Sequence, residues 1–287
     1  MWHLSWRYSV TQTHPFCRQS NSRCQMPGTA CNSPRCSVRY APMLGRLILL
    51  CHLLALPLRA ADAAEVTVAV AANFLTTAKA LAQQFEGTSA HRLLLVGGST
   101  GRLAAQIDAG APFDVFLSAD TARPQALLAS GRAVQVGPYA VGRLVLAGPV
   151  GMPDTWAAAL ADASNAPLAL ANPDLAPYGA AAMAALQAQA LTPTALITGD
   201  SVGQVAAFLA TGNVEYGLLA LAQVRDALDQ DPRFAFVEAP DSGAVLLQSA
   251  ALLRDTVGAR AFFDWIVGPD AAKVIEAAGY HLPADGR

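Results

Sequence analysis

Short apolar runs alternate with amphipathic segments along the chain from position 64 onward. The first run, 65–71 (EVTVAVA), is rich in β-branched residues and predicts a strand, whereas 75–85 places Leu75, Leu81 and Phe85 on one face of a helix. The same pattern predicts further strands at 92–96, 113–118, 141–147, 167–171, 214–219, 234–237 and 244–252. It predicts further helices at 103–109, 122–130, 180–190, 200–210, 259–267 and 269–278. This alternation indicates an α/β protein whose mainly parallel sheet is covered by helices.

Two breaks divide this pattern into lobes. Gly148-Pro149 ends one strand before a second α/β set begins, and a turn at 239–243 leads the chain back to the first set. We therefore predict lobe I at 64–143, lobe II at 144–241 and a return to lobe I at 242–287. Each lobe is expected to hold its own sheet and core.

The N-terminal residues have the pattern of a targeting segment. Arg46 precedes an apolar stretch, 47–58, and the small residues of Ala61-Asp62-Ala63 follow it, as in a secretory signal peptide. The stretch is shorter than the about 20 apolar residues that a membrane-spanning helix needs. We predict a signal peptide at 43–63 and export to the periplasm. The segment 1–42 has no regular strand or helix period and is expected to be a non-native or disordered extension.

Composition removes several classes of function. All five cysteines lie before position 64, so the exported chain would have neither a disulfide nor thiol chemistry. From 64 to 287, 20 Asp and Glu stand against 12 Lys and Arg, a formal charge of −8. This acidity disfavours nucleic acid and anionic membranes as partners. Any anion that binds must be held by local dipoles, because the overall charge repels it.

Two strand-to-helix turns of lobe I carry polar groups that can donate hydrogen bonds. Asn73 follows the strand at 65–71, and Ser99 and Thr100 follow the next strand within a turn at 97–101. Open α/β sheets bind ligands at the carboxyl ends of their strands, where helix N-termini present unpaired N–H groups. Each of these residues could instead cap the helix that follows it, and for Ser99 and Thr100 the two roles are compatible.

Two turns of lobe II match them. Tyr178 precedes a helix and can donate from its phenol, and Asp200-Ser201-Val202-Gly203 opens a helix whose first N–H groups have no intrahelical partner. Tyr178 could equally be a core aromatic residue, and Ser201 a cap. Arg102 is the one cation beside these turns, and we expect it to point outward along its helix. Four neutral donors around one cleft would suit an oxyanion.

From 66 to about 278 the chain resembles the periplasmic molybdate-binding proteins of ABC transporters. The resemblance rests on GSTGRLAAQIDAGAPFDVFLSAD at 98–120, with AANF at 71–74, NPDLAPYG at 172–179 and GDSVGQV at 199–205 in the same order. It implies a two-lobed class II periplasmic-binding-protein fold that closes on one tetrahedral oxyanion, molybdate or tungstate, and delivers it to a membrane ABC permease. We expect no enzymatic activity, no cofactor and a monomer.

The resemblance also implies the residues that hold the oxyanion. Carried over by motif, they are Asn73, Ser99 or Thr100, Tyr178 and the backbone of Val202. Members of the family differ at these positions, because Asn73 stands where some have Ser and Tyr178 where some have Ala. Some members place a tyrosine after the strand at 214–219, where this chain has Ala220. We hypothesise that Tyr178 compensates for this missing donor to molybdate.

The alternative function is that of a secreted α/β serine hydrolase. Gly97-Gly98-Ser99-Thr100-Gly101 fits the GxSxG pattern of a nucleophile elbow, and His281 lies downstream with several Asp residues between them. However, only one clear strand precedes the strand that leads into this turn, whereas that fold builds several strands first. Ser99 as a nucleophile therefore stays the alternative.

Overall fold

The computed structural model describes residues 64–227, 231–240 and 245–284, all within one compact unit, Arg59–Arg287. The predicted extension at 1–42, the predicted signal peptide at 43–63 and most of the expected turn at 239–243 lie outside the described residues. Within the described ranges, no helix combines the length and the apolar character that crossing a membrane requires.

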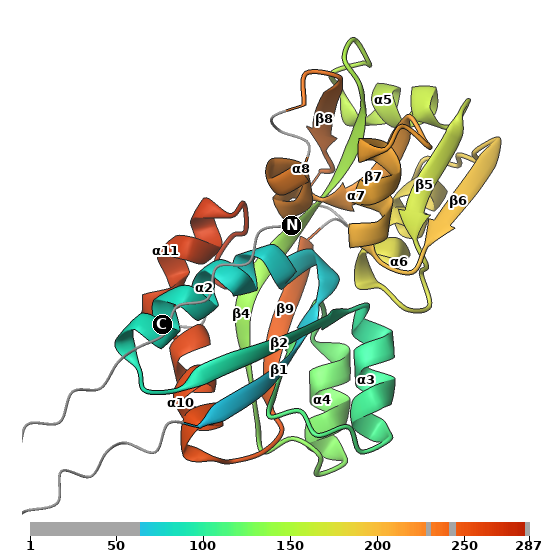
Figure 1. Cartoon of the computed structure of the whole chain (residues 1–287). Helices are drawn as coiled ribbons and strands as arrows, with labels where there is room; N and C mark the ends of the chain where they lie inside the picture. The colour runs from blue at the N-terminus through green and yellow to red at the C-terminus, as the bar shows by residue number, and fades with distance from the viewer. Residues whose placement is uncertain (1–63, 228–230, 241–244, 285–287) are drawn as a thin grey trace, which may run out of the picture. The chain divides into compact units, whose positions relative to one another are not determined.

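Strands and helices alternate along the chain, as the pattern of apolar positions predicts (Figure 1). The first elements are β1 (Glu65–Ala71), the 3-10 helix η1 (Ala72–Phe74), α2 (Leu75–Thr88), β2 (Arg92–Gly98), α3 (Thr100–Asp108), β3 (Val115–Ser118), α4 (Ala122–Ala129) and β4 (Gln135–Pro149). The next are α5 (Trp156–Ala163), β5 (Pro167–Ala171), α6 (Pro177–Ala188), β6 (Ala195–Gly199), α7 (Val202–Ala210), β7 (Tyr216–Ala220) and α8 (Leu221–Ala227). The last are β8 (Phe234–Glu238), β9 (Val245–Leu252), α10 (Val257–Ile266) and α11 (Pro269–Ala277).

The sheet of the first lobe runs in the order β2-β1-β3-β9-β4. Strand β1 pairs in parallel with β2 and β3, and β9 runs antiparallel to β3 and β4. Helices α2, α10 and α11 cover one face, and α3 and α4 cover the other (Figure 1). Successive side chains of β1 point to opposite faces of the sheet, so this strand contributes to the core on each face. Val66, Val68 and Val70 pack with α2, α10 and α11, whereas Ala69 packs with Leu103 of α3.

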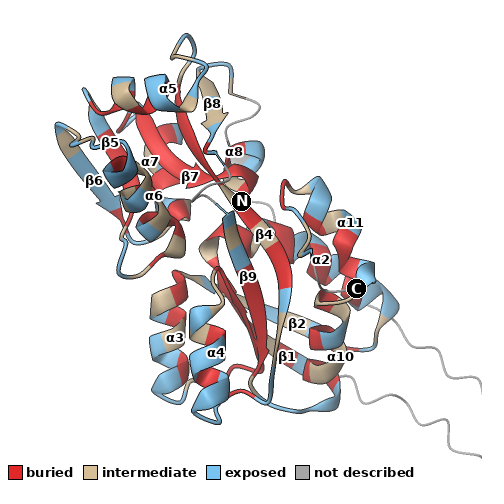
Figure 2. Ribbon diagram, turned by 180° about the vertical axis from the view of Figure 1, so that it is seen from behind, coloured by how far each residue is buried: buried red, intermediate tan, exposed pale blue. Residues whose placement is uncertain are grey.

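The second lobe holds a sheet in which β5 pairs in parallel with β6 and β7, and β4 runs antiparallel to β7 and β8. Its central strands are buried on both faces, as the burial colours of Figure 2 show. Leu144, Leu146, Leu168 and Leu218 are fully buried there. Continuous apolar strands of this kind are typical of sheets that are covered on both sides.

Strand β4 connects the two lobes without interruption. Its residues up to Arg143 pair with β9, whereas those from Leu144 onward pair with β7, so the strand leaves one sheet and enters the other between these residues. The expected break at Gly148-Pro149 is wrong, because β4 continues through both residues while it pairs with β8. The lobe limits at 64–143, 144–241 and 242–287 stay a prediction.

The elements differ from the sequence-based expectation mainly at their ends. Strand β2 extends to Gly98 and α3 begins at Thr100, so the turn predicted at 97–101 is reduced to Ser99. The pattern did not predict β6 or α8, and for α5 it indicated only that Trp156 lies in a helical pattern, without bounds. Helix α8 follows β7 without an intervening residue, and so no Gly or Pro marks its start. Strand β6 lies at the sheet edge and has three exposed residues, which obscure its period.

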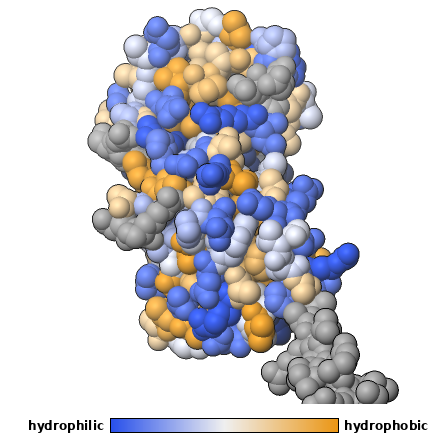
Figure 3. Space-filling view, turned by 90° about the vertical axis from the view of Figure 1, so that its left-hand side faces the viewer, coloured by the Kyte–Doolittle hydropathy of each residue, from blue (hydrophilic) through white to orange (hydrophobic). Residues whose placement is uncertain are grey.

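Exposed apolar side chains are scattered over the described surface. Leu94, Val150 and Val257 are exposed on different parts of the chain. On the face drawn in Figure 3, hydrophobic and hydrophilic side chains are intermixed. Single exposed apolar residues are normal on a protein surface and mark no site by themselves.

The close approach of α6 to β5 gives a first prediction. A Cβ atom at Gly179 would overlap the carbonyl oxygen of Ala171, whereas a Cβ atom at Gly87 in α2 would meet nothing within 4 Å. Gly179→Ala should therefore lower the free energy of unfolding by about 1–3 kcal/mol, because backbone atoms must move. Gly87→Ala should raise it by roughly 0.5–1 kcal/mol, because alanine favours the helix. Urea unfolding measures both, and equal stability of the two variants would contradict the described packing.

Candidate functional site

The strand ends expected to carry the site meet at one cavity. The space between its wall atoms is about 190 Å³, part of which is open to solvent. Its lining consists of Ala72, Asn73, Ser99, Thr100, Ala119, Ala176, Pro177, Tyr178, Ser201 and Val202. All the residues predicted to hold an oxyanion are therefore in its wall, and they come from the carboxyl ends of β1, β2, β5 and β6.

Ser99 supplies a hydrogen-bonding group that the protein does not use. It is the N-cap residue of α3, but its side chain makes no capping hydrogen bond. The residue is 5% exposed, and its Oγ atom is buried with no hydrogen-bond partner among the described residues. A buried hydroxyl without a partner is unfavourable, so this one is suited to a ligand in the cavity.

The hydroxyl oxygens of Thr100 and Ser201 each accept a hydrogen bond from a backbone N–H group. Thr100 is the first residue of α3, and its Oγ1 atom accepts a hydrogen bond of 3.3 Å from the backbone N–H of Ala119. Ser201 caps α7, because its Oγ atom accepts from the backbone N–H of Gln204 at 3.4 Å. Val202 is then the first residue of α7, and helix α7 presents its positive end at the cavity wall.

Tyr178 lies between the cavity and the strands that connect the lobes. Its phenol oxygen accepts a hydrogen bond of 3.3 Å from Nε2 of Gln248 in β9. It also lies against Gly142 of β4, where any Cβ atom would overlap it. The side chain is 1% exposed. Tyr178 is therefore buried in the core and also lines the cavity. This position is compatible with both interpretations of the sequence, a core aromatic residue and a donor to a ligand.

A buried polar network continues behind Tyr178. Oε1 of Gln248 accepts hydrogen bonds from Asn73 Nδ2 at 2.9 Å and from the Tyr139 phenol at 3.0 Å. Asn73 Nδ2 also donates to the Tyr280 phenol oxygen at 3.2 Å, and the Tyr280 hydroxyl donates to the carbonyl oxygen of Asn73 at 2.6 Å. The amide hydrogens of Asn73 are thus used inside the protein. Asn73 lines the cavity, but its side chain neither caps α2 nor points a spare donor at a ligand.

The sequence analysis did not predict Tyr139, Gln248 or Tyr280. One signal was present for Gln248, because a single amide interrupts the otherwise apolar or small residues of VLLQSAAL in β9. Such a residue, fully buried in a strand, needs partners. No comparable signal marked the two tyrosines, since aromatic residues are common in any core.

Burial controls the ionisation of the tyrosines. Burial raises the pKa of Tyr178 well above its usual value, and the neighbouring amides of Gln248 and Asn73 partly oppose this shift. Burial also raises the pKa of Tyr139 and Tyr280, and the charges of neighbouring groups raise it further. All three phenols are therefore neutral at physiological pH and keep their protons for hydrogen bonding.

The lobes contact each other at the rim of the cavity. The backbone N–H of Gly101 donates to the carbonyl oxygen of Leu175 at 2.8 Å. Arg102, expected to point outward along its helix, forms an ion pair of 2.8 Å with Asp200 across the lobes. Both side chains are more than half exposed, so the pair contributes at most about 1 kcal/mol. The positive charge of Arg102 is therefore already paired with a carboxylate.

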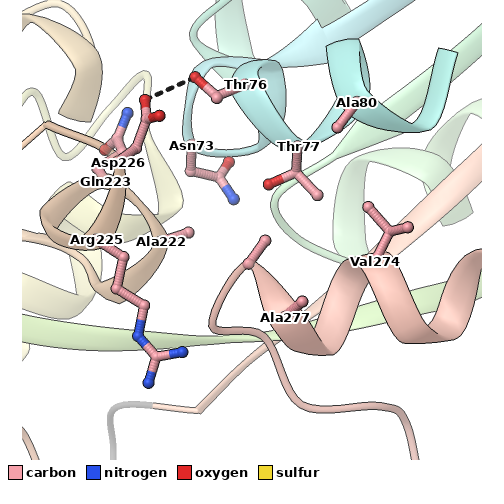
Figure 4. A pocket seen from close by; sticks show the side chains of 11 residues that line it. Asn73, Thr76, Thr77, Ala80, Ala222, Gln223, Arg225, Asp226, Val274 and Ala277 are labelled. Carbon is pink, nitrogen blue, oxygen red and sulfur yellow. Dashed lines mark hydrogen bonds between the residues drawn. The ribbon is translucent and has the colours of Figure 1, made fainter. Parts of the chain in front are cut away.

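A second, larger cavity adjoins the first at Asn73 (Figure 4). It contains about 620 Å³ of space not filled by protein atoms and lies between α2, α8 and α11. Asp226 accepts a hydrogen bond of 2.8 Å from Thr76, and the side chain of Arg225 extends away from Asp226 (Figure 4). The wall holds both the carboxylate of Asp226 and the guanidinium of Arg225, so it offers an anion no net positive charge. The smaller cavity, with its unpaired hydroxyl and two helix N-termini, is the better oxyanion site.

The geometry gives no support to the hydrolase alternative. A nucleophilic serine needs a base within hydrogen-bond distance, but Ser99 Oγ has no such partner among the described residues. His281 is exposed and forms backbone hydrogen bonds with Val141. Within the described residues, no group of three His, Cys, Asp or Glu side chains could hold a metal ion.

Comparison with known proteins identifies similar chains. The family described as bacterial extracellular solute-binding protein matches residues 66–281. The chain is 40% identical over 232 residues to the molybdate-binding protein ModA of Azotobacter vinelandii, covering 78% of this chain and 92% of that protein. It is 37% identical over 237 residues to the ModA protein of Rhodobacter capsulatus, covering 79% of this chain and 91% of that protein.

Solved structures agree with these relatives. The periplasmic molybdate-binding protein of Azotobacter vinelandii superposes with a TM-score of 0.67 at 34% identity, covering 76% of this chain and 99% of that chain. Iron-bound HitA from Pseudomonas aeruginosa, at 17% identity and a TM-score of 0.58, covers 78% of this chain and 88% of its own and shares the fold alone. The predicted α/β periplasmic-binding-protein fold is therefore confirmed.

The buried phenols give a prediction for the pH dependence of stability. An exposed tyrosine in the unfolded chain titrates near about pH 10, whereas the folded chain holds its phenols protonated to higher pH. The folded state then binds more protons above about pH 10, so the free energy of unfolding should fall as pH rises from there. Each phenol contributes up to about 1.4 kcal/mol per pH unit.

Urea unfolding between pH 8 and 11 measures this dependence. Tyr280→Phe should reduce the slope above pH 10 and leave the slope between pH 8 and 9 unchanged. The same slope in both proteins above pH 10 would show that Tyr280 already titrates normally in the folded chain.

Proposed function

The chain belongs to the family of bacterial extracellular solute-binding proteins, and from this premise we propose that it captures molybdate or tungstate in the cavity between its lobes. The observation that carries the proposal is the buried, unpartnered hydroxyl of Ser99 between the N-termini of α3 and α7. The 40% identity with ModA of Azotobacter vinelandii, a molybdate-binding protein, supports the choice of ligand.

The proposed ligand contacts are all neutral donors. They are the hydroxyls of Ser99 and Thr100, the phenol of Tyr178 and the backbone N–H of Val202. Asn73 was also expected among them and lines the cavity, and its role as a ligand residue stays a prediction. Its side-chain amide hydrogen-bonds to Gln248, which in turn donates to Tyr178. A dianion buried without partners would be very unfavourable, so each oxygen must receive at least one of these donors.

The energies suffice for tight binding. A hydrogen bond to a charged group contributes about 1.5–3 kcal/mol, and a helix N-terminus adds up to about 2 kcal/mol when it is partly buried. Four such bonds with two helix ends can exceed the about 8.2 kcal/mol that corresponds to a Kd of 1 μM. No formal positive charge is required.

The same donors make the proposed site selective among tetrahedral anions. Hydrogen phosphate carries a proton that needs an acceptor, and the proposed contacts are donors. Sulfate carries no proton and is rejected by size, because its oxygens lie closer together than those of molybdate. Molybdate and tungstate have nearly the same size and charge, so the cavity is expected to bind both.

The proposal includes a location and a partner. The signal pattern at 43–63 supports export to the periplasm. One relative in the solved structures is a periplasmic molybdate-binding protein. We propose that closure of the lobes around the oxyanion forms the surface that a membrane ABC permease recognises, and that the protein acts as a monomer.

Removal of the Ser99 hydroxyl tests the site. Ser99→Ala should weaken molybdate binding by about 10- to 150-fold, because one charge-assisted hydrogen bond is lost. Calorimetric titration with molybdate, tungstate, sulfate and phosphate measures the effect and the selectivity. Ser130→Ala is the matched control. The Ser130 hydroxyl donates to a backbone carbonyl at the end of α4, away from the cavity, so this variant should bind molybdate normally. Unchanged affinity of the Ser99 variant would place the ligand elsewhere.

Removal of the Tyr178 phenol tests the hypothesis that it replaces the missing tyrosine at Ala220. Tyr178→Phe should weaken molybdate binding about tenfold or more, since the ring remains but the hydroxyl, which would donate to the oxyanion and which accepts from Gln248, is lost. Calorimetry under the same conditions measures it. If the variant binds as tightly as the unmodified protein, Tyr178 is only a core residue.

A further inference from the structure

Two loops of the second lobe lead directly into the wall of the smaller cavity. The loop after β5 ends at Ala176, where one segment of the wall begins, and the loop after β6 ends at Ser201, where another begins. A displacement of either loop would therefore move the wall. Each loop is contacted, outside the cavity, by an arginine of the first lobe.

Arg123 of α4 holds the loop after β5. Its Nη2 atom donates to the carbonyl oxygen of Asp174 at 3.2 Å. Its Nη1 atom forms an ion pair with Asp120, whose Oδ1 atom also accepts from the backbone N–H of Arg123 at 3.1 Å. The planar guanidinium is thus fixed in the first lobe by Asp120 and reaches the second lobe with its other nitrogen.

The next carbonyl group of the same loop is held as well. The backbone N–H of Gly101 in α3 donates to the carbonyl oxygen of Leu175 at 2.8 Å. A Cβ atom at Gly101 would lie 3.0 Å from this oxygen and 3.2 Å from Nη2 of Arg123. Because position 101 has no side chain, α3, Arg123 and the loop can meet at one point.

Arg102 holds the loop after β6 through its ion pair of 2.8 Å with Asp200. The backbone N–H of Asp200 donates to Oε1 of Gln204 at 2.6 Å, which connects this loop to the first turn of α7. Arg102 and Arg123 are each paired with a carboxylate, and neither belongs to the lining of the cavity. Their contacts therefore join the lobes without offering an unpaired positive charge to an anion.

We propose that Arg102 and Arg123 are positioning residues that form a latch, holding both loops against the first lobe and slowing the release of a bound oxyanion. This inference rests on the proposed function, because it assigns residues that keep the cavity closed. The contacts exist only while the lobes touch, so the latch stabilises the closed state and acts on dissociation. Since neither arginine lines the cavity, the latch slows the release of molybdate and tungstate by the same factor.

The release of radioactive molybdate into an excess of unlabelled molybdate measures the latch. Arg123→Ala should release molybdate about five- to tenfold faster, because a charge-assisted hydrogen bond between the lobes is lost from a partly exposed side chain. Arg132→Ala is the matched control. Arg132 pairs with Asp108 at 3.5 Å within the first lobe, so this variant should release molybdate at the unmodified rate.

The outcomes separate the latch from the proposed function. Equal release rates of the Arg123 and Arg132 variants, with tight binding by the unmodified protein, would overturn the latch and leave the proposed function standing. If the unmodified protein binds neither molybdate nor tungstate, the proposed function fails, and the latch fails with it.

A double-mutant cycle tests the contribution of Arg102. Arg102→Ala and Asp200→Ala each change the charge near the anion, but these direct effects add in the double variant. If the pair forms on closure, Arg102→Ala should speed release about two- to fivefold more with Asp200 present than with Ala at position 200. The same factor in both backgrounds would remove Arg102 from the latch.

Gly101→Ala decides the question if Arg123→Ala does not fold. The added Cβ atom presses across the lobes on Leu175 and Arg123, whereas within the first lobe alanine favours the helix α3. Faster release of molybdate, with no loss of stability of the ligand-free protein in urea unfolding, supports the latch. An unchanged release rate overturns it.

Discussion

A doubly charged oxyanion leaves water only when hydrogen-bond donors replace the water at each of its oxygens. The acidic chain described here has no unpaired cation in the proposed site, since Arg102 is bound to Asp200. The proposed donors are therefore neutral hydroxyls, a phenol and backbone N–H groups. How much each contributes to binding depends on whether it points at an oxygen of the ligand. The architecture of the cavity follows from this requirement.

The fold supplies such donors where its strands end. The carboxyl ends of β1 and β2 in one lobe meet those of β5 and β6 in the other, because β4 and β9 carry the chain between the two sheets. Helices α3 and α7 begin at this point and direct their positive ends at the cavity. Because the walls come from both lobes, an oxyanion bound there as proposed would stabilise the contact between the lobes and so favour their closure.

Behind this surface lies a polar network inside an otherwise apolar interior. Gln248, Asn73 and three tyrosines satisfy one another, and burial keeps the phenols protonated. Buried polar groups are costly unless they are hydrogen-bonded, and these five side chains hydrogen-bond to one another. The unpaired hydroxyl of Ser99 marks the side of the cavity that we propose a ligand satisfies.

The sequence by itself determined the α/β class, most strands and helices, and the turns that carry Ser99, Thr100, Tyr178 and Val202, because local apolar periods and turn residues encode these features. It did not determine which way a side chain points. Only the tertiary structure left Ser99 without a cap, turned Asn73 into the interior, and brought Gln248 and Tyr280 to Tyr178. These contacts join residues up to 207 positions apart, and no local pattern records a partner at that separation.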